Sequence, residues 1–167
     1  FLGGNQLQQF NTDKKYLINY YKQIQWICDL SKKYPNLKIA FKHHQSLKID
    51  DKKELEMLKK TSIKRIVKTE QGYLNQSYGY AINAKVRLTW CSTMAYELLG
   101  HNIHCYFLDP KMENESFLHN YEYNKFWRLD TYEKFENKIK DILENNRIDE
   151  IKNNENFCIK SEGFVEK

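Results

Sequence analysis

The feature that most constrains the fold of this chain is an alternation of short apolar runs with longer segments of helical periodicity. Strands are predicted at residues 37–41, 63–67, 86–90 and 103–108, where apolar residues cluster. Apolar residues at helical spacing predict helices over residues 13–33, 51–60, 74–83, 93–99 and 131–145, and a further helix over 149–156. Strands that alternate with helices in this way are typical of an α/β fold with a parallel sheet and right-handed crossovers.

The predicted architecture is Rossmann-like: a parallel sheet of about five strands with helices on both faces. Residues 1–4 (FLGG) provide the first strand in this interpretation. The chain has 167 residues, the length of one domain, and no Pro/Gly-rich linker interrupts it. We therefore expect one domain over 1–167, with the helices of 131–167 packed on it. Because the chain begins inside a predicted strand, we also expect an upstream domain that this sequence lacks.

Charge and composition narrow the classes of partner. The chain carries 27 Lys and Arg residues against 22 Asp and Glu, a net charge of +5, and only four of the basic residues are Arg. Nucleic-acid-binding proteins usually cluster Arg and Lys on one face, whereas here Lys alternates with acidic residues. We expect no specific nucleic-acid partner, although a lysine-rich binding surface remains an alternative.

The remaining composition indicates a reducing compartment. No apolar run approaches the ~20 residues of a membrane-spanning helix, and no signal peptide is visible. The four cysteines form no CxxC pair, and His101, His104 and His119 lack partners at metal-ligand spacing. We expect a cytoplasmic protein with no metal and no required cofactor.

In α/β folds, ligands bind at the carboxyl ends of the strands, and polar residues follow several of the predicted strands. Lys42 and His44 follow the strand at 37–41 and share one face; Ser92 and Thr93 follow the strand at 86–90 and open a helix that carries Glu97. Hydroxyl groups at a helix N-terminus suit a phosphate, and Glu97 suits a ribose. Three further candidates lie in the other strand-end loops: Asn5, Gln6 and Gln71.

Each of these residues also has a purely structural interpretation. Ser92 is a normal N-cap residue, Glu97 is a normal exposed helix residue, and Lys42 with His44 fits a solvated loop. No nucleophile and base form a recognisable pair, so the catalytic residues are not assigned.

The order K-x-H after one strand, S-T-x-x-x-E after a later one, and F-L-D-P at the end of the next resembles the donor-binding half of GT-B glycosyltransferases. The likeness covers about residues 37–110 and is greatest to bacterial enzymes that build capsule, lipooligosaccharide or other surface glycans, including sialyltransferase-like and Kdo-transferase-like proteins. The sequence departs from the family pattern at Gln45, where the family has Pro.

The resemblance implies a nucleotide-sugar donor, with a CMP-linked sugar favoured, a glycan acceptor, and a missing N-terminal acceptor domain. It implies that His44 contacts the nucleotide and that Ser92 and Thr93 hold the phosphate. A cytoplasmic location, at or near the inner face of the membrane, follows from that function. The alternatives are a GT-B sugar-nucleotide epimerase and a non-catalytic flavodoxin-like binding module.

Overall fold

The structure, a computed structural model, describes residues 14–42, 52–66, 73–89, 92–110 and 127–148. The described helices are α1 (Lys14–Lys33), α2 (Lys52–Lys59), α3 (Tyr73–Asn83), α4 (Thr93–Gly100) and α7 (Tyr132–Asn145). The described strands are β1 (Ala40–Lys42), β2 (Lys64–Ile66), β3 (Leu88–Thr89), β4 (Tyr106–Leu108) and β5 (Arg128–Leu129).

The strands form two parallel groups within the described ranges. β1 pairs with β2, and β4 lies between β3 and β5 in a three-stranded sheet. The chain therefore has a mixed α/β fold, and the four strands predicted after residue 36 are present at shorter lengths. Among the described strands, pairing is found within a group of two and a group of three, so the single sheet of about five strands stays a prediction.

One described strand was not predicted, and two predicted elements lie outside the described residues. β5 was not predicted, because two residues are too few to show an apolar pattern. The strand predicted at residues 1–4 and the helix predicted at 149–156 lie outside the described residues. The parallel alignment of β5 with β4 places Phe107 opposite Arg128 and Leu108 opposite Leu129.

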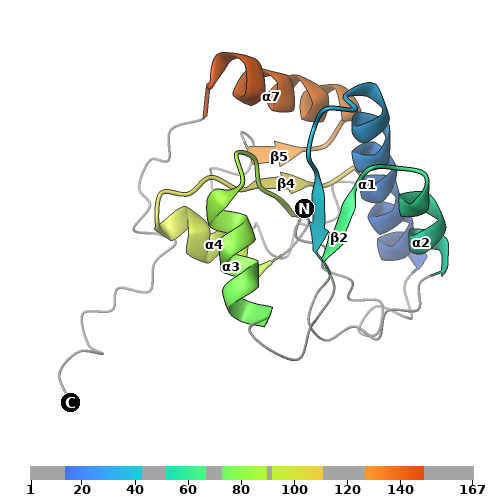
Figure 1. Ribbon diagram of the computed structural model, residues 1–167, viewed down its shortest axis with the longest axis horizontal. Coiled ribbons are helices and arrows are strands. Elements are labelled where there is room, and N and C mark those ends of the chain that lie inside the picture. The colour runs from blue at the N-terminus through green and yellow to red at the C-terminus, as the bar shows by residue number, and fades with distance from the viewer. Residues whose placement is uncertain (1–13, 43–51, 67–72, 90–91, 111–126, 149–167) are drawn as a thin grey trace.

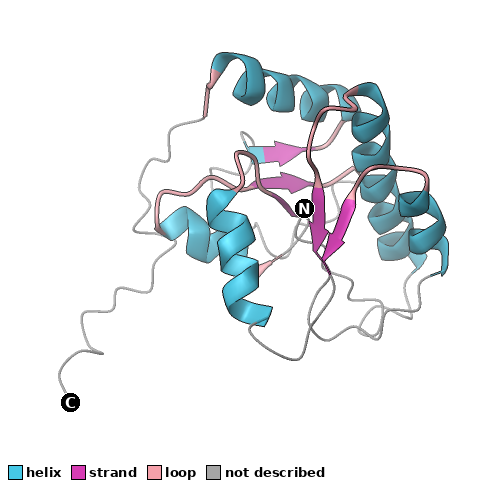
Figure 2. Cartoon of the chain, in the orientation of Figure 1, coloured by secondary structure: helices cyan, strands magenta, loops and turns pink. Residues whose placement is uncertain are grey.

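Helices flank the strands on two sides. α1, α2 and α7 lie on one side, and α3 and α4 lie on the other (Figures 1 and 2). Aromatic contacts join α1 to α7, since the Trp26 ring stacks on Phe135 with centroids 6.3 Å apart and meets Tyr132 edge-on at 6.2 Å. On the opposite side, Tyr96 of α4 packs against Phe107 of β4 at 5.7 Å. Burial of these aromatic side chains stabilises both layers.

The ends of α7 agree with the prediction from its sequence. Thr131 is the N-cap residue, and its side chain accepts a hydrogen bond from the backbone N–H of Lys134 at 3.2 Å. Phe135, Ile139 and Ile142 are buried against the core, as their helical spacing predicts. This amphipathic face fixes α7 over the strands.

Many helices end with a left-handed glycine directly after the last helical residue, but α4 ends differently. Gly100 is instead the last helical residue, His101 is the C-cap with φ of −96°, and Asn102 takes the left-handed conformation with φ of 60°. Asn tolerates this conformation better than most residues. The N–H of Ile103 then donates to the Leu98 carbonyl at 2.8 Å and closes the turn.

In the described ranges, every helix is too short or too polar to cross a lipid bilayer.

Candidate functional site

Lys42 is the last residue of β1, which is the position predicted for a ligand-binding cation. Its side chain is buried, with 6% of its surface exposed. Removal from water disfavours the ammonium form and lowers the pKa of Lys42 from 10.5 to about 8. Lys42 therefore remains cationic at neutral pH, although its charge is poorly hydrated. An anion that reaches Lys42 would thus gain more binding free energy than it would at an exposed lysine.

Ser92 precedes α4 and has extended backbone angles of φ −156° and ψ 131°. Its carbonyl accepts from the N–H of Ala95 at 3.0 Å, but its side chain makes no capping hydrogen bond. Ser92 is therefore the N-cap residue by position, as expected, but its side chain does not cap the helix. The Ser92 hydroxyl is half-buried at the N-terminus of α4, where the helix dipole favours negative charge.

Glu97 lies on the exposed surface of α4 and contacts α3. Its Oε2 atom accepts a hydrogen bond from the Tyr78 hydroxyl. This hydrogen bond, together with burial and the negative charge of Glu97, raises the pKa of Tyr78. The carboxylate predicted to hold a ribose thus has Tyr78 beside it, and the pair joins the two helices.

The predicted site residues fall into two groups. Lys42 lines a cavity with Lys64 and Tyr80, whereas Ser92 and Glu97 are not among the residues that line it. Helix α3 lies between the groups, because Tyr78 contacts Glu97 and the Tyr80 hydroxyl accepts from Lys64 Nζ at 3.3 Å. The sequence analysis did not identify either tyrosine. The two tyrosines alternate with small residues in the sequence SYGY, but this pattern does not indicate which helix or strand each tyrosine contacts.

Several predicted residues have no described environment. His44, Asn5, Gln6 and Gln71 lie outside the described residues. Thr93 opens α4, but its side chain is likewise not described. The predicted contacts of His44 and Thr93 therefore stay predictions.

The described cysteines do not suit nucleophilic chemistry. Cys28 and Cys105 are free and buried. Burial raises the pKa of Cys28 to about 11 and that of Cys105 to about 12, so both are neutral thiols near pH 7. Among the described side chains, no three His, Cys, Asp or Glu residues gather around one point as metal ligands would.

Comparison with known proteins gave no match to a family model, to a curated protein or to a solved structure.

Proposed function

We propose that this chain is the donor-binding domain of a glycosyltransferase and that it binds a nucleotide-activated sugar at the carboxyl ends of β1 and β3. The observation that carries the proposal is the unit formed by β3 and α4. A buried strand leads to Ser92, whose hydroxyl does not cap the helix that it precedes. Backbone N–H groups and a hydroxyl at that point are suited to a phosphate.

Electrostatics would then favour departure of the nucleotide. As the bond between sugar and phosphate breaks, negative charge grows on the phosphate oxygens. The N-terminal dipole of α4 and the hydroxyl of Ser92 would stabilise that charge, and the ammonium of Lys42 at the end of β1 would add a positive charge at the second strand end. A CMP-linked sugar is the favoured donor, by the resemblance to sialyltransferase-like proteins. Another domain would bind the glycan acceptor and would carry the catalytic base.

Calorimetric titration of the chain with CMP, CDP, UDP and GDP tests the proposal. We expect one nucleotide to bind and Ser92→Ala to weaken that binding by about tenfold, the loss of one hydrogen bond to a charged group. The matched control is Ser62→Ala, because Ser62 is exposed, precedes β2 and has its hydroxyl 3.3 Å from that of Ser31 on α1. Equal affinity in Ser92→Ala and Ser62→Ala would show that the phosphate is not held at α4.

Product analysis separates the alternatives. If a nucleotide binds and the sugar nucleotide is hydrolysed or epimerised without an acceptor, the chain belongs to the epimerase class. If none of the four nucleotides raises the melting temperature at millimolar concentration, the proposal fails and a binding module without nucleotide takes its place.

A further inference from the structure

A large cavity lies between the two groups of strands. Its volume is about 720 Å³, within the range of small-molecule sites. The walls are mainly apolar: α1 contributes Ile27 and Leu30, α7 contributes Phe135 and Ile139, and β3 contributes Leu88. Each of these five side chains is also part of the buried core. The cavity therefore offers an apolar interior to the body of a ligand.

The charged residues around this cavity have one sign. The five that line it are all basic, and among the described lining residues none is acidic: Lys38, Lys42, Lys64, Lys85 and Arg87. Such a lining attracts anions and repels cations.

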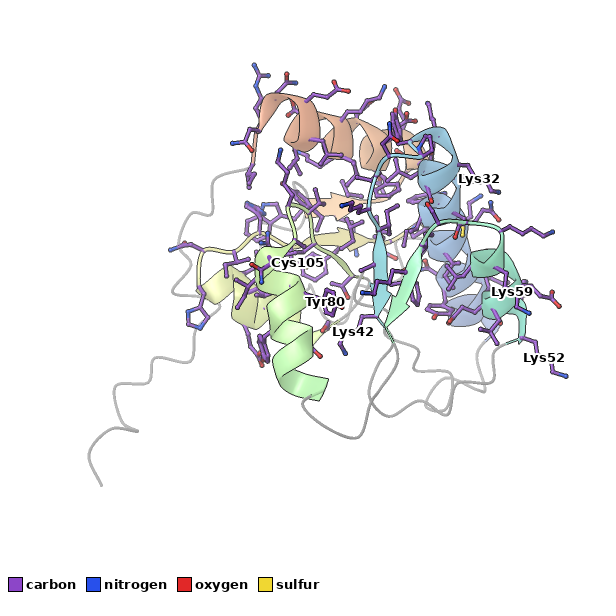
Figure 3. All side chains as sticks on the ribbon, in the orientation of Figure 1. Lys32, Lys42, Lys52, Lys59, Tyr80 and Cys105 are labelled. Atoms are coloured by element: carbon purple, nitrogen blue, oxygen red, sulfur yellow. The ribbon has the colours of Figure 1, made fainter. Side chains whose placement is uncertain are left out.

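Lys42 differs from the other basic lining residues in its burial. Lys38, Lys64 and Lys85 are exposed, and Arg87 donates to the carbonyls of Ala81 and Ile82 at the end of α3. Figure 3 shows Lys42 and Tyr80 in the region between β1 and α3. Lys42 thus places a cation against the apolar interior.

Helix α3 leaves space on its side of the cavity. Gly79 lies in the middle of this helix, and a Cβ atom added there would meet no atom within 4 Å. Ala81 lies one residue beyond Tyr80, is 4% exposed and also lines the cavity. Small residues at both positions keep the cavity open, although glycine weakens a helix.

From the cavity and its charge we infer that the chain binds an amphipathic anion, with an apolar body between α1, α7 and β3 and a carboxylate or phosphate head at Lys42. The site differs from the one proposed for the nucleotide, because Ser92 and Glu97 do not line the cavity. The two sites share Lys42 alone among the residues assigned to them.

Four probes with the same eight-carbon chain test this inference: octanoate, octyl phosphate, octanol and octyltrimethylammonium. Each is titrated below its micelle concentration, and the methyl resonances of Ile27 and Ile139 report where it binds. We expect both anions to bind about tenfold tighter than octanol, a difference of about 1.4 kcal/mol. The ratio between octanoate and octyl phosphate identifies the preferred head group, and the cation should bind weakest.

Variants distinguish the contribution of the Lys42 charge to binding from the contribution of the cavity space. Lys42→Met should reduce anion affinity to that of octanol, whereas Lys42→Arg should keep most of the preference. Lys59→Met is the control, because Lys59 is exposed on α2 and is not among the residues that line the cavity. Ala81→Phe should fill the cavity and abolish binding of all probes. If Ala81→Phe does not fold, Gly79→Leu takes its place, since its added side chain begins in open space.

Three results would overturn the inference. The first is equal affinity for octanoate and octanol in the unmodified chain, which removes the role of charge. The second is unchanged octanoate binding in the folded cavity-filling variant. The third is the absence of any shift at Ile27 and Ile139 with all four probes.

Discussion

Replacing Asp109 by alanine tests the buried polar cluster that joins α1 to the ends of β4 and β5. The Asp109 side chain is fully buried. Its Oδ1 accepts from Asn19 Nδ2 at 3.0 Å, and its Oδ2 pairs with Arg128 Nη2 at 3.1 Å. The Asp109 N–H also donates to the Leu129 carbonyl at 3.0 Å, so the backbone already holds the residue beside β5.

The magnitude follows from what the substitution leaves behind. Removing one partner of a buried ion pair is destabilising by about 3–5 kcal/mol, because the other charge remains without compensation. Arg128 retains 14% exposure of its side chain, so water reaches part of it and the lower end of that range applies. Loss of the hydrogen bond from Asn19 adds to the same effect. We expect Asp109→Ala to lower the free energy of unfolding by about 3 kcal/mol.

Urea denaturation at pH 7, followed by tryptophan fluorescence, measures this change. The double variant Asp109→Ala/Arg128→Met should be more stable than Asp109→Ala alone, because it no longer buries an unpaired guanidinium. The control is Asp130→Ala, which breaks a pair with Lys134 of 2.8 Å in which the lysine side chain is 59% exposed. That change should stay within about 0.5 kcal/mol. A destabilisation in Asp109→Ala no larger than in the control would refute the reasoning.

Three further predictions concern pH and helix stability. Burial lowers the pKa of Lys42 from 10.5 to about 8, so the unfolded chain holds this proton more tightly and the free energy of unfolding should rise from pH 8 to pH 10.5. Lys42→Met should reduce that rise in urea midpoints. The hydrogen bonds from Lys33 and Tyr34 lower the pKa of Glu136 from its usual value of 4.5. These bonds stabilise the folded chain above pH 4.5, and this stabilisation is lost as Glu136 becomes protonated on acidification. Glu136→Gln should therefore make the melting temperature depend less on pH on the acid side. Gly79→Ala should raise stability by about 0.5–1 kcal/mol in thermal denaturation, because α3 gains a better helix former without a clash.

The helices were predictable because their signal is local. A period of 3.6 residues repeats over several turns in the segments that form α1 and α7, and the observed bounds of both helices agree with the predicted ranges within one residue. The buried face of α7 was also predicted, since Phe135, Ile139 and Ile142 recur at that period. Tertiary contacts did not need to be known for these elements.

The strands were harder to predict because their pairing is not local. β5 contains only Arg128 and Leu129, and two residues carry no periodicity. A charged residue opens this strand, and its charge is compensated by Asp109, which follows β4 in the fold. Asp109 had been interpreted only as the residue that ends a strand. Its buried role depends on Asn19, at a sequence separation of 90 residues, which no local pattern indicates.

For the candidate residues, the sequence indicated their places along the chain but not their contacts. Parallel strands expose polar residues at their carboxyl ends, and Lys42 is the last residue of β1, whereas Ser92 directly precedes α4. The hydrogen bond between Tyr78 and Glu97 depends on how α3 packs against α4. That packing is a property of the folded chain, and the same sequence pattern is compatible with an exposed tyrosine.

The burial of Lys42 links strand geometry to function. The buried Lys42 side chain, which lines the largely apolar cavity, loses hydration, and its lowered pKa reflects that loss. A methionine of similar length would fill the same space without a charge, so the lysine is not required for packing. Charged groups that are kept in poorly hydrated positions are frequently used for binding or catalysis. Both proposed ligands are anions that would meet this one cation, from the strand end or from the cavity. Ser92→Ala and Ala81→Phe each affect only one of these approaches, so the two variants together determine which anion Lys42 binds.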